Sequence, residues 1–323
     1  MDHDSESEQL ASPWLIAVWP GMGHVAMNAG FYLAAKLEMR VFAEFLPREL
    51  YDVDHVEVKD GIIRQVRVPR NRLFLWRDPE GKRDLVLFIG EAQPPTGKRA
   101  LCRGLIDTAR ELGVERVFTF AALSTQMRPD EKSRVVAAAT EDSTLEEVSQ
   151  ADIDVLREGH IGGLNGVLLG AASEMRMPGV CLLGSIPHLF AQLPYPGASL
   201  AVLKVFRELS GIPIELSELE NQANQVSRQL TSLLSKMEGG LRLIPPKSEE
   251  ESAKEPEVGD NEANDLEEPP LVSPRDNQTI ESLFTQAKED RSKAYELKQE
   301  LDRLGVFAEY EDRFLDLFRK PEE

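Results

Sequence analysis

Predicted strands and helices alternate along the first 240 residues, and this alternation limits the possible folds more than any other feature of the sequence. Six apolar runs rich in β-branched and aromatic residues have the length of buried strands, and helical patterns closed by Gly or Pro separate most of them. The predicted strands are 14–19, 40–45, 84–90, 116–120, 134–139 and 179–184, and the predicted helices are 24–39, 98–112, 164–175 and 198–209. Such a pattern predicts an α/β fold with a mostly parallel sheet covered on both faces.

Residues 54–76 interrupt this alternation. The segment HVEV is followed by Asp60-Gly61 and then by IIRQVRV, which is the pattern of a β-hairpin with an Asp-Gly turn. We therefore expect an antiparallel edge or flap at this point of the chain.

Charge and proline content place a boundary near residue 240. Residues 247–274 contain ten acidic residues and two lysines, and they include no aromatic residue. Such a segment cannot bury enough apolar surface to offset the loss of chain entropy on folding. The predicted regions are a disordered acidic N-terminal tail (1–12), an α/β core domain (13–240), an acidic, proline-containing flexible linker (241–274) and C-terminal amphipathic helices (275–323).

The segment after the linker has the periodicity of an amphipathic helix that ends at Gly305. Its apolar register runs through Ile280, Leu283, Ala287, Ala294, Leu297, Leu301 and Leu304, with Asp290 at the one polar position. A second short helix is predicted through residues 307–318. These helices either fold back on their own domain, which we favour, or pair with another chain or a partner groove.

The charge balance excludes some classes of partner. The chain has 56 acidic and 37 basic residues and a formal net charge of -19, which argues against sequence-independent binding of nucleic acid or of an anionic membrane surface. The two cysteines, Cys102 and Cys181, are not spaced as metal ligands, and their small number is typical of a reducing compartment. The sequence has no run of 18 apolar residues and no basic, apolar leader at its start. We expect a soluble, cytoplasmic protein.

Two glycine-rich turns are the candidate sites. The first predicted strand runs into PGMGHVA (20–26), where Gly21, Gly23 and His24 precede a helix whose backbone N–H groups could face an anion. The pattern GxGxxA, with Glu44 about 20 residues further on, is close to a dinucleotide fingerprint. Tight turn formation and close helix packing explain the same glycines, and we favour that interpretation.

The second turn lies before the predicted helix 164–175. It contains Gly162, Gly163, Asn165 and Gly166, and it lacks the Lys-Ser or Lys-Thr pair of a nucleoside triphosphate loop. If both turns lie at the carboxyl edge of the sheet, they form the crevice where open α/β folds bind ligands. Tight packing, including packing at a subunit interface, is an equally good interpretation.

No complete catalytic set is found. The five histidines are not spaced as metal ligands, and no GxSxG elbow occurs. Glu91 follows a predicted strand, where a site residue could lie, but no second acid pairs with it. We therefore predict no catalytic residues, no metal and no cofactor, and an enzyme is the less favoured class.

A series of motifs resembles one protein family. The motifs, in chain order, are AVWPGMGHVAMNAG, LVLFIGEAQPP, GVERVFTFAALS, EGHIGGLNGVLLGAA, GVCLLGSIPHLFAQLPYPGAS and IPIELSELENQANQV. Their order and spacing resemble the proteasome assembly chaperone two family over about residues 13–238. The resemblance implies a three-layer α/β/α domain of phosphorylase- or hydrolase-like architecture that forms homo-oligomers. It also implies a non-catalytic binding module, since eukaryotic and archaeal relatives help proteasome rings to assemble.

These observations favour a homo-oligomeric, assembly-chaperone-like protein that binds another protein. The alternative is a nucleotide- or phosphate-binding enzyme or sensor that uses the turns Gly21–Ala26 and Gly162–Gly166. The chain ends in RKPEE (319–323), unlike the hydrophobic, tyrosine-containing tail by which archaeal assembly factors of this kind can dock, so docking by such a tail is not expected. A further hypothesis is that the terminal helices occlude a basic surface of the core until a partner displaces them.

Overall fold

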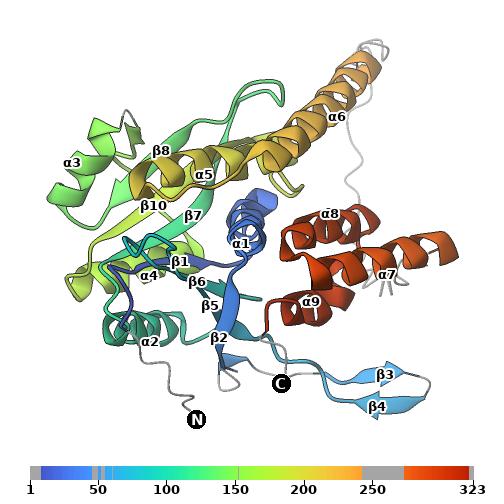
Figure 1. The fold of residues 1–323 in the computed structure, drawn as a ribbon. Helices are drawn as coiled ribbons and strands as arrows, with labels where there is room; N and C mark the ends of the chain where they lie inside the picture. Colours follow the sequence, from blue (N-terminus) through green and yellow to red (C-terminus); the bar gives the residue numbers. More distant parts are fainter. Residues whose placement is uncertain are drawn as a thin grey trace, which may run out of the picture.

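The computed structural model describes residues 9–45, 50–51, 55–59, 61–151, 153–241 and 273–319. Its centre is an eight-stranded sheet with the strand order β2-β5-β6-β1-β7-β10-β8-β9 (Figure 1). In chain order the strands are β1(Trp14–Val18), β2(Arg40–Phe45), β5(Asn71–Trp76), β6(Leu85–Gly90), β7(Arg116–Thr125), β8(Val135–Ala139), β9(Asp154–Val155) and β10(Gly179–Pro187). Strands β6, β1, β7 and β10 are parallel, while β5 pairs antiparallel with β6 and β2, and β8 pairs antiparallel with β10.

Helices cover both faces of this sheet, which confirms the predicted α/β fold. Along β1, Trp14, Ile16 and Val18 belong to one apolar cluster, and Leu15 and Ala17 belong to the other, because successive side chains of a strand point to opposite faces. The first cluster includes α1(Val25–Lys36), α5(Pro196–Ser210) and α6(Ser217–Leu241), and the second includes α2(Lys98–Glu111) and α4(Gly163–Glu174). A short helix, α3(Asp142–Gln150), contacts β8.

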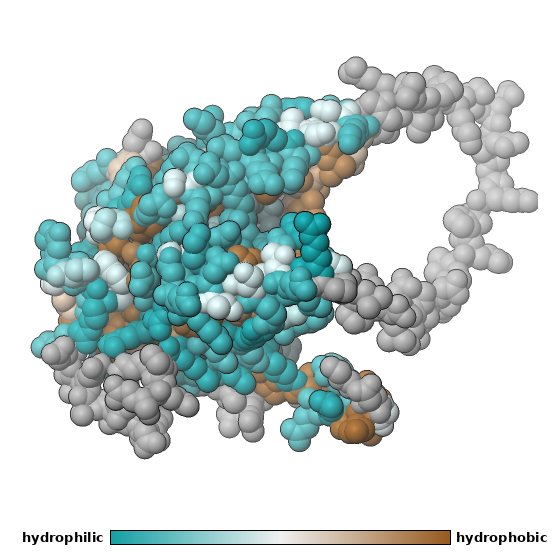
Figure 2. Space-filling view, turned by 45° about the vertical axis from the view of Figure 1, so that its right-hand side comes forward, coloured by the Kyte–Doolittle hydropathy of each residue, from teal (hydrophilic) through white to brown (hydrophobic). Residues whose placement is uncertain are grey.

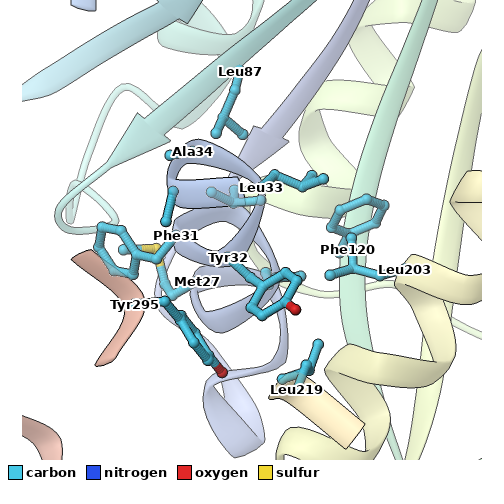
Figure 3. Close-up of a cluster of buried hydrophobic side chains, with 14 of the residues drawn as sticks. Met27, Phe31, Tyr32, Leu33, Ala34, Leu87, Phe120, Leu203, Leu219 and Tyr295 are labelled. Carbon is cyan, nitrogen blue, oxygen red and sulfur yellow. The ribbon is translucent and has the colours of Figure 1, made fainter. Parts of the chain in front are cut away.

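The C-terminal helices pack against their own core. They are α7(Pro274–Glu289), α8(Ala294–Leu304) and α9(Phe307–Asp316). Figure 3 shows Tyr295 of α8 beside Tyr32 of α1, with ring centroids 4.5 Å apart. Phe31 of α1 contacts Phe307 and Phe314. Helix α1 is therefore buried on all sides, between the sheet and the C-terminal helices.

The prediction of one continuous helix up to Gly305 is wrong, because the chain leaves the helical conformation at Asp290 (φ -135°, ψ 100°). The Asp290 side chain accepts a hydrogen bond from the Ser292 N–H and caps the short turn Arg291–Lys293 that leads into α8. The apolar register had concealed the break, because Ala287 and Ala294, on its two sides, are both buried.

The predicted hairpin is confirmed as β3(Glu57–Lys59) and β4(Ile62–Arg64), which form a separate two-stranded sheet; Asp60 lies outside the described residues. The segment after it forms β5, an antiparallel strand of the main sheet that was not predicted. The predicted linker lies almost entirely outside the described residues, as do residues 1–8 of the predicted N-terminal tail. Within the described part of the chain, no helix is both long and apolar enough to cross a membrane.

Candidate functional site

The two glycine-rich turns lie side by side at the carboxyl edge of the parallel strands. The side chain of Gln93, just after β6, joins them: its Nε2 donates to the Pro20 carbonyl (2.8 Å), and its Oε1 accepts from the Leu164 N–H (3.1 Å). Open α/β sheets commonly bind ligands at this edge. The predicted site residues that the structure brings together are Gly21, Gly23, His24, Gly162, Gly163, Asn165 and Gly166.

Two backbone donors of the first turn, the N–H groups of Gly23 and His24, are used within the protein. Gly23 adopts a left-handed conformation (φ 60°); its N–H donates to the Ala191 carbonyl (2.8 Å), and its carbonyl accepts from the Tyr195 N–H (2.9 Å). His24 donates its N–H to the Gly21 carbonyl (3.1 Å). The turn therefore fixes the entrance to α1 and does not offer these donors to an anion.

The imidazole of His24 adds no positive charge to this turn. Burial lowers the pKa of His24, and the nearby Lys298 of α8 lowers this pKa further, so the ring is neutral at neutral pH. Among the described residues, no three His, Cys, Asp or Glu side chains are grouped so that they could hold a metal ion.

The second turn is tightly packed on one side and open on the other. A Cβ at Gly166 would lie 1.9 Å from the Ile161 carbonyl oxygen, so no larger residue fits there. A Cβ at Gly162, in contrast, would meet no atom within 4 Å, and the same is true of Gly21 in the first turn. Gln93 already satisfies the Leu164 N–H at the start of α4, in the position that a bound anion would need.

Buried polar atoms without a partner lie in this part of the fold. The Nε1 of Trp19, both amide atoms of Asn71 and the Oδ1 of Asn165 have no hydrogen-bond partner among the described residues. A Cβ at Gly90 would lie within 3.0 Å of both Trp19 and Asn71, so these two side chains approach each other at the ends of β1 and β5. These unpartnered atoms of Trp19, Asn71 and Asn165 include both hydrogen-bond donors and acceptors, and none of them is charged.

The topology does not fit the dinucleotide interpretation. In that motif the second strand lies beside the first and parallel to it, whereas β5 and β6 separate β2 from β1 here, and β2 is antiparallel to its neighbour. Glu44 is also occupied, because its carboxylate pairs with Arg70 (3.1 Å) and Arg319 (2.7 Å). Glu44 is therefore not available as a ribose ligand.

Glu91 belongs to a different cluster from the glycine turns. Its side chain, 3% exposed, forms an ion pair with Arg72, which is 1% exposed, and another with Arg67 (2.9 Å). Asp312 of α9 pairs with the same two arginines, at 2.5 Å from Arg67 and 2.9 Å from Arg72. Glu91 thus helps to fasten the C-terminal helices to β5 and the segment before it.

Burial and charge shift the acids of this cluster in opposite directions. Burial raises the pKa of Glu311 to about 7, and the neighbouring Glu91 carboxylate contributes to the rise. The pKa of Asp312 is lowered, because hydrogen bonds from Arg67 and Arg72 outweigh its desolvation. The sequence signal for this cluster was available in Arg67, Arg70 and Arg72, whose close spacing on one segment calls for acidic partners elsewhere in the chain.

A surface hollow lies beside the first turn, because Tyr195, one of its lining residues, donates its backbone N–H to the Gly23 carbonyl (2.9 Å). It is a cavity of about 470 Å³ between α5, α6 and the segment that leads into β8. Its apolar lining includes Val135, Leu200, Ala201 and Val205. Its charged lining residues are Asp130, Glu131, Lys132, Lys204 and Glu220. No local pattern in the sequence indicates this cavity, because its lining residues come from four separate segments of the chain.

The β3–β4 hairpin exposes apolar side chains that the sequence analysis did not single out. Val56, Val58, Ile62 and Ile63 are 53–70% exposed, and Figure 2 shows this apolar region away from the body of the molecule. The alternating valines of HVEV and the two isoleucines after the turn were the available signal, since they predict an apolar surface that either the core or a partner must cover.

The comparisons with known proteins decide the family. The model of the PAC2 family matches residues 15–234. The chain belongs to the PAC2 family. An uncharacterized protein of Methanocaldococcus jannaschii is 28% identical over 251 residues, which cover 75% of this chain and 92% of that protein.

Solved structures of PAC2 relatives share the fold. A PAC2 family protein from Streptomyces avermitilis is 28% identical, with a TM-score of 0.58 over 68% of this chain and 95% of that one. The Mycobacterium tuberculosis proteasome-assembly chaperone homologue is 25% identical, with a TM-score of 0.59 over 68% and 94%. Pyrococcus furiosus PbaB, an archaeal proteasome activator, has a TM-score of 0.59 over 71% and 94%; at 24% identity it supports the fold alone.

The PAC2 match ends before the C-terminal helices. Residues 15–234 include both glycine turns, the hairpin and the cavity, whereas α7, α8 and α9 lie beyond residue 234. The arginines that hold α9 are thus inside the family region, and their acidic partners on α9 are outside it.

Proposed function

We propose that this PAC2 protein is a non-catalytic, assembly-chaperone-like protein of the cytoplasm that self-associates and binds another protein. The first glycine turn carries the proposal. Its neighbours Met22, Leu189 and Leu193 are 46%, 58% and 43% exposed, and the segment that holds the two leucines is hydrogen-bonded to Gly23. Exposed apolar side chains on a fixed turn suit a protein partner, and the N–H groups of Gly23 and His24 are already bonded within the protein and so are not offered to an anion.

The family supports the same class of function. The M. tuberculosis relative is described as a proteasome-assembly chaperone homologue. By analogy, the partner of this chain is a subunit of a larger protein assembly, and the glycine turns serve as an interface rather than as a catalytic site. No cofactor, nucleic acid or membrane is part of the proposal.

Affinity purification of the tagged full-length protein from its own cells, followed by mass spectrometry, tests this function. We expect a stoichiometric partner whose recovery falls at least about tenfold in the double variant Met22→Asp/Leu189→Asp, since charges there oppose burial in an interface. Gln192→Ala, an exposed change in the same segment, is the matched control. Equal recovery by both variants would contradict a role for this surface.

A second candidate function is binding of a small polar ligand between the two turns. The buried Oδ1 of Asn165, which has no partner among the described residues, and the open sides of Gly21 and Gly162 favour it. A ligand at about one hundred times its dissociation constant stabilises the fold by about 2.7 kcal/mol. A thermal-shift panel of nucleotides, inorganic phosphate and nucleosides would reveal this, with Asn165→Leu as the variant that abolishes the shift. Absence of any shift across the panel would remove this candidate.

A further inference from the structure

The last part of α6 exposes apolar side chains that continue a buried stripe of the same helix. Leu219 and Leu230 are buried in the core, with Val226 packed beside them. Leu233 and Met237 are 42% and 49% exposed. All five share one face of α6, because they follow one another at steps of seven, four, three and four residues. We call this series the α6 stripe.

Contacts with α1 explain where the α6 stripe leaves the core. The hydroxyl of Tyr32 in α1 donates to the Glu215 carbonyl, just before α6 (2.9 Å). One turn earlier in α1, the Asn28 side chain accepts from the Tyr295 hydroxyl (3.2 Å), which also contacts Gln222 of α6. Helix α6 therefore runs toward the N-terminal end of α1 and continues past it. Figure 1 shows the end of α6 projecting beyond the other helices.

The first glycine turn lies at the base of this projecting end. The Pro129 carbonyl joins the two, because it accepts from the Tyr195 hydroxyl (3.3 Å) and from the Ser227 hydroxyl of α6 (2.8 Å). Tyr195 also donates its N–H to the Gly23 carbonyl (2.9 Å). The exposed apolar residues of the turn thus adjoin the exposed part of the stripe. We define the α6–turn surface as Met22, Leu189, Leu193, Leu233 and Met237.

The geometry of this surface fits a helix. Apolar residues at steps of three and four form the seam by which one helix packs on another, and helix-in-groove recognition uses the same spacing. An extended peptide would need an unpaired strand edge, which α6 does not offer. Residues 231–241 of α6 span roughly 16 Å, which a partner helix of about three turns would cover. Figure 2 shows apolar side chains on the lower side of this projecting end.

The charges beside the α6 stripe favour an acidic partner. Between Glu220 and Glu238, α6 has no acidic residue, although the chain carries a net charge of -19. Lys236 is exposed and flanks the stripe next to Met237. In the described part of the chain, the ion pairs of α6 are made by Glu218, Glu220 and Glu238, and Lys236 takes part in none. An acidic residue of a partner helix would pair with it.

A second copy of α6 does not supply that acid. In an antiparallel pair of helices, Lys236 would face the same flank of the other copy, where Gln229 and Lys236 lie. In a parallel pair it would face the opposite flank, where Ser227 and Leu234 lie. Neither arrangement pairs the charge.

We propose that the α6–turn surface binds an amphipathic helix of another protein, about three turns long. The apolar residues of that helix are spaced by three and four, and acidic residues flank them. This inference rests on the proposed binding of another protein, and it names the surface and the structural class of the bound segment.

Photo-cross-linking of the full-length protein in its own cells tests the occupant. Benzoylphenylalanine replaces Leu233 in one variant and Leu189 in another, and mass spectrometry identifies the cross-linked peptides. We expect both positions to reach the same partner, and Leu233 to reach a segment with the stated spacing and acidic flanks. Ser235, exposed on the opposite side of α6, is the matched control position and should not reach that segment.

Fluorescence anisotropy with a synthetic peptide of the cross-linked segment tests the charge. Lys236→Glu should weaken binding about two- to fivefold, as expected for an exposed ion pair, and a lysine in place of the facing acid of the peptide should restore it. Leu233→Asp should weaken binding at least about tenfold, since it buries a charge. Arg228→Glu, an exposed change away from the stripe, is the matched control and should leave the affinity unchanged.

Each other outcome overturns the proposal. A cross-link from Leu233 to a second copy, or to another segment of the same chain, would show that something else covers the stripe. A partner reached from Leu189 alone would exclude α6 while the proposed function stands. A bound segment without helical spacing, or equal affinity of Lys236→Glu and wild type, would contradict the helix or the charge pairing. Absence of any partner, from both positions and from affinity purification, would remove the proposed function as well.

Discussion

The face of α1 and the β3–β4 hairpin both carry apolar side chains, yet the chain covers the first and leaves the second in solvent. Phe31 and Tyr32 of α1 are at most 1% exposed, because the rings of α8 and α9 pack on them. Val58 and Ile63 of the hairpin are 66% and 70% exposed. Hydrophobicity alone therefore does not tell where a partner binds. What matters is whether other segments of the same chain pack on the apolar side chains and exclude water from them.

The largest expected effect in this comparison is the loss of stability on deleting α7, α8 and α9, the helices that cover α1. A chain that ends at Leu241 would expose Phe31, Tyr32 and Phe74, all at most 1% exposed in the full chain. We expect a fall in the melting temperature of more than 10 °C and strong binding of a hydrophobic dye, since a loss of a few kcal/mol shifts the midpoint by several degrees per kcal/mol.

The same truncation tests the hypothesis that the terminal helices occlude a basic surface. The structure places Arg67, Arg70 and Arg72 against Asp312 of α9. Truncation would remove this carboxylate and uncover the apolar face, while the three arginines would keep their pairs with Glu91 and Glu44. If occlusion regulates binding, affinity purification with the truncated chain should recover more partner. Unchanged or weaker recovery, with the fold intact by circular dichroism, would assign α7–α9 a purely structural role.

The next largest effect on stability is expected from breaking the ion pairs that hold α9 to β5. Replacing Arg72 with Met removes the buried partner of Glu91, whose side chain is 3% exposed, and one of the partners of Asp312. Breaking a buried ion pair from one side typically costs about 3–5 kcal/mol, because it leaves a buried charge without compensation. Urea denaturation measures the change. Arg99→Met, at an exposed pair with Glu174, is the matched control and should change the free energy of unfolding by less than about 1 kcal/mol.

The strands and helices of the core could be predicted from the sequence, whereas the break at Asp290 and the long-range ion pairs could not, and the reason is physical. Strands such as 85–90 and helices such as 98–111 are set by local periodicity, and their predicted bounds agree closely with the structure. The break at Asp290 was missed because the apolar register continues across it. The pairing of Arg72 with Asp312 joins residues 240 positions apart, which no local pattern specifies.

For the candidate site, the sequence likewise indicated backbone positions but not the contacts of a side chain. The meeting of the two glycine turns was predicted conditionally from strand direction, and Gln93 joins them in the structure. Glu91 was chosen because it follows a strand, but its side chain joins the arginine cluster instead. Strand position specifies where a backbone ends, whereas side-chain direction depends on neighbours contributed by distant segments.

A smaller effect is expected from the proton on Glu311. Its pKa is about 7 in the folded protein, above its ordinary value of 4.5, so the folded state holds this proton more tightly than the unfolded state does. The stabilisation is complete below about pH 4.5 and is lost as the pH rises to about 7. Glu311→Gln keeps the neutral form, so it should exceed the wild type in stability at pH 8 by up to roughly 3 kcal/mol.

The difference between the two proteins isolates this carboxyl group from other titrations. His24, whose pKa is lowered, contributes stability that is lost as the pH falls, which is the opposite trend, and it is present in both proteins. Denaturant midpoints at half-unit steps from pH 4.5 to 8 measure the difference. A constant gap between the two curves would show that Glu311 does not titrate in this range.

The smallest expected effect on stability comes from a substitution in the exposed β3–β4 hairpin. Ile63→Ser removes an aliphatic side chain that is already 70% exposed, so the free energy of unfolding of the dilute protein should change by no more than about 0.5 kcal/mol. The matched change Phe314→Ala, at a ring that is fully buried against Phe31, should cost about 3–5 kcal/mol. If Ile63→Ser were as destabilising as Phe314→Ala in dilute protein, the hairpin would be part of the core, and the contrast between the two surfaces would fail.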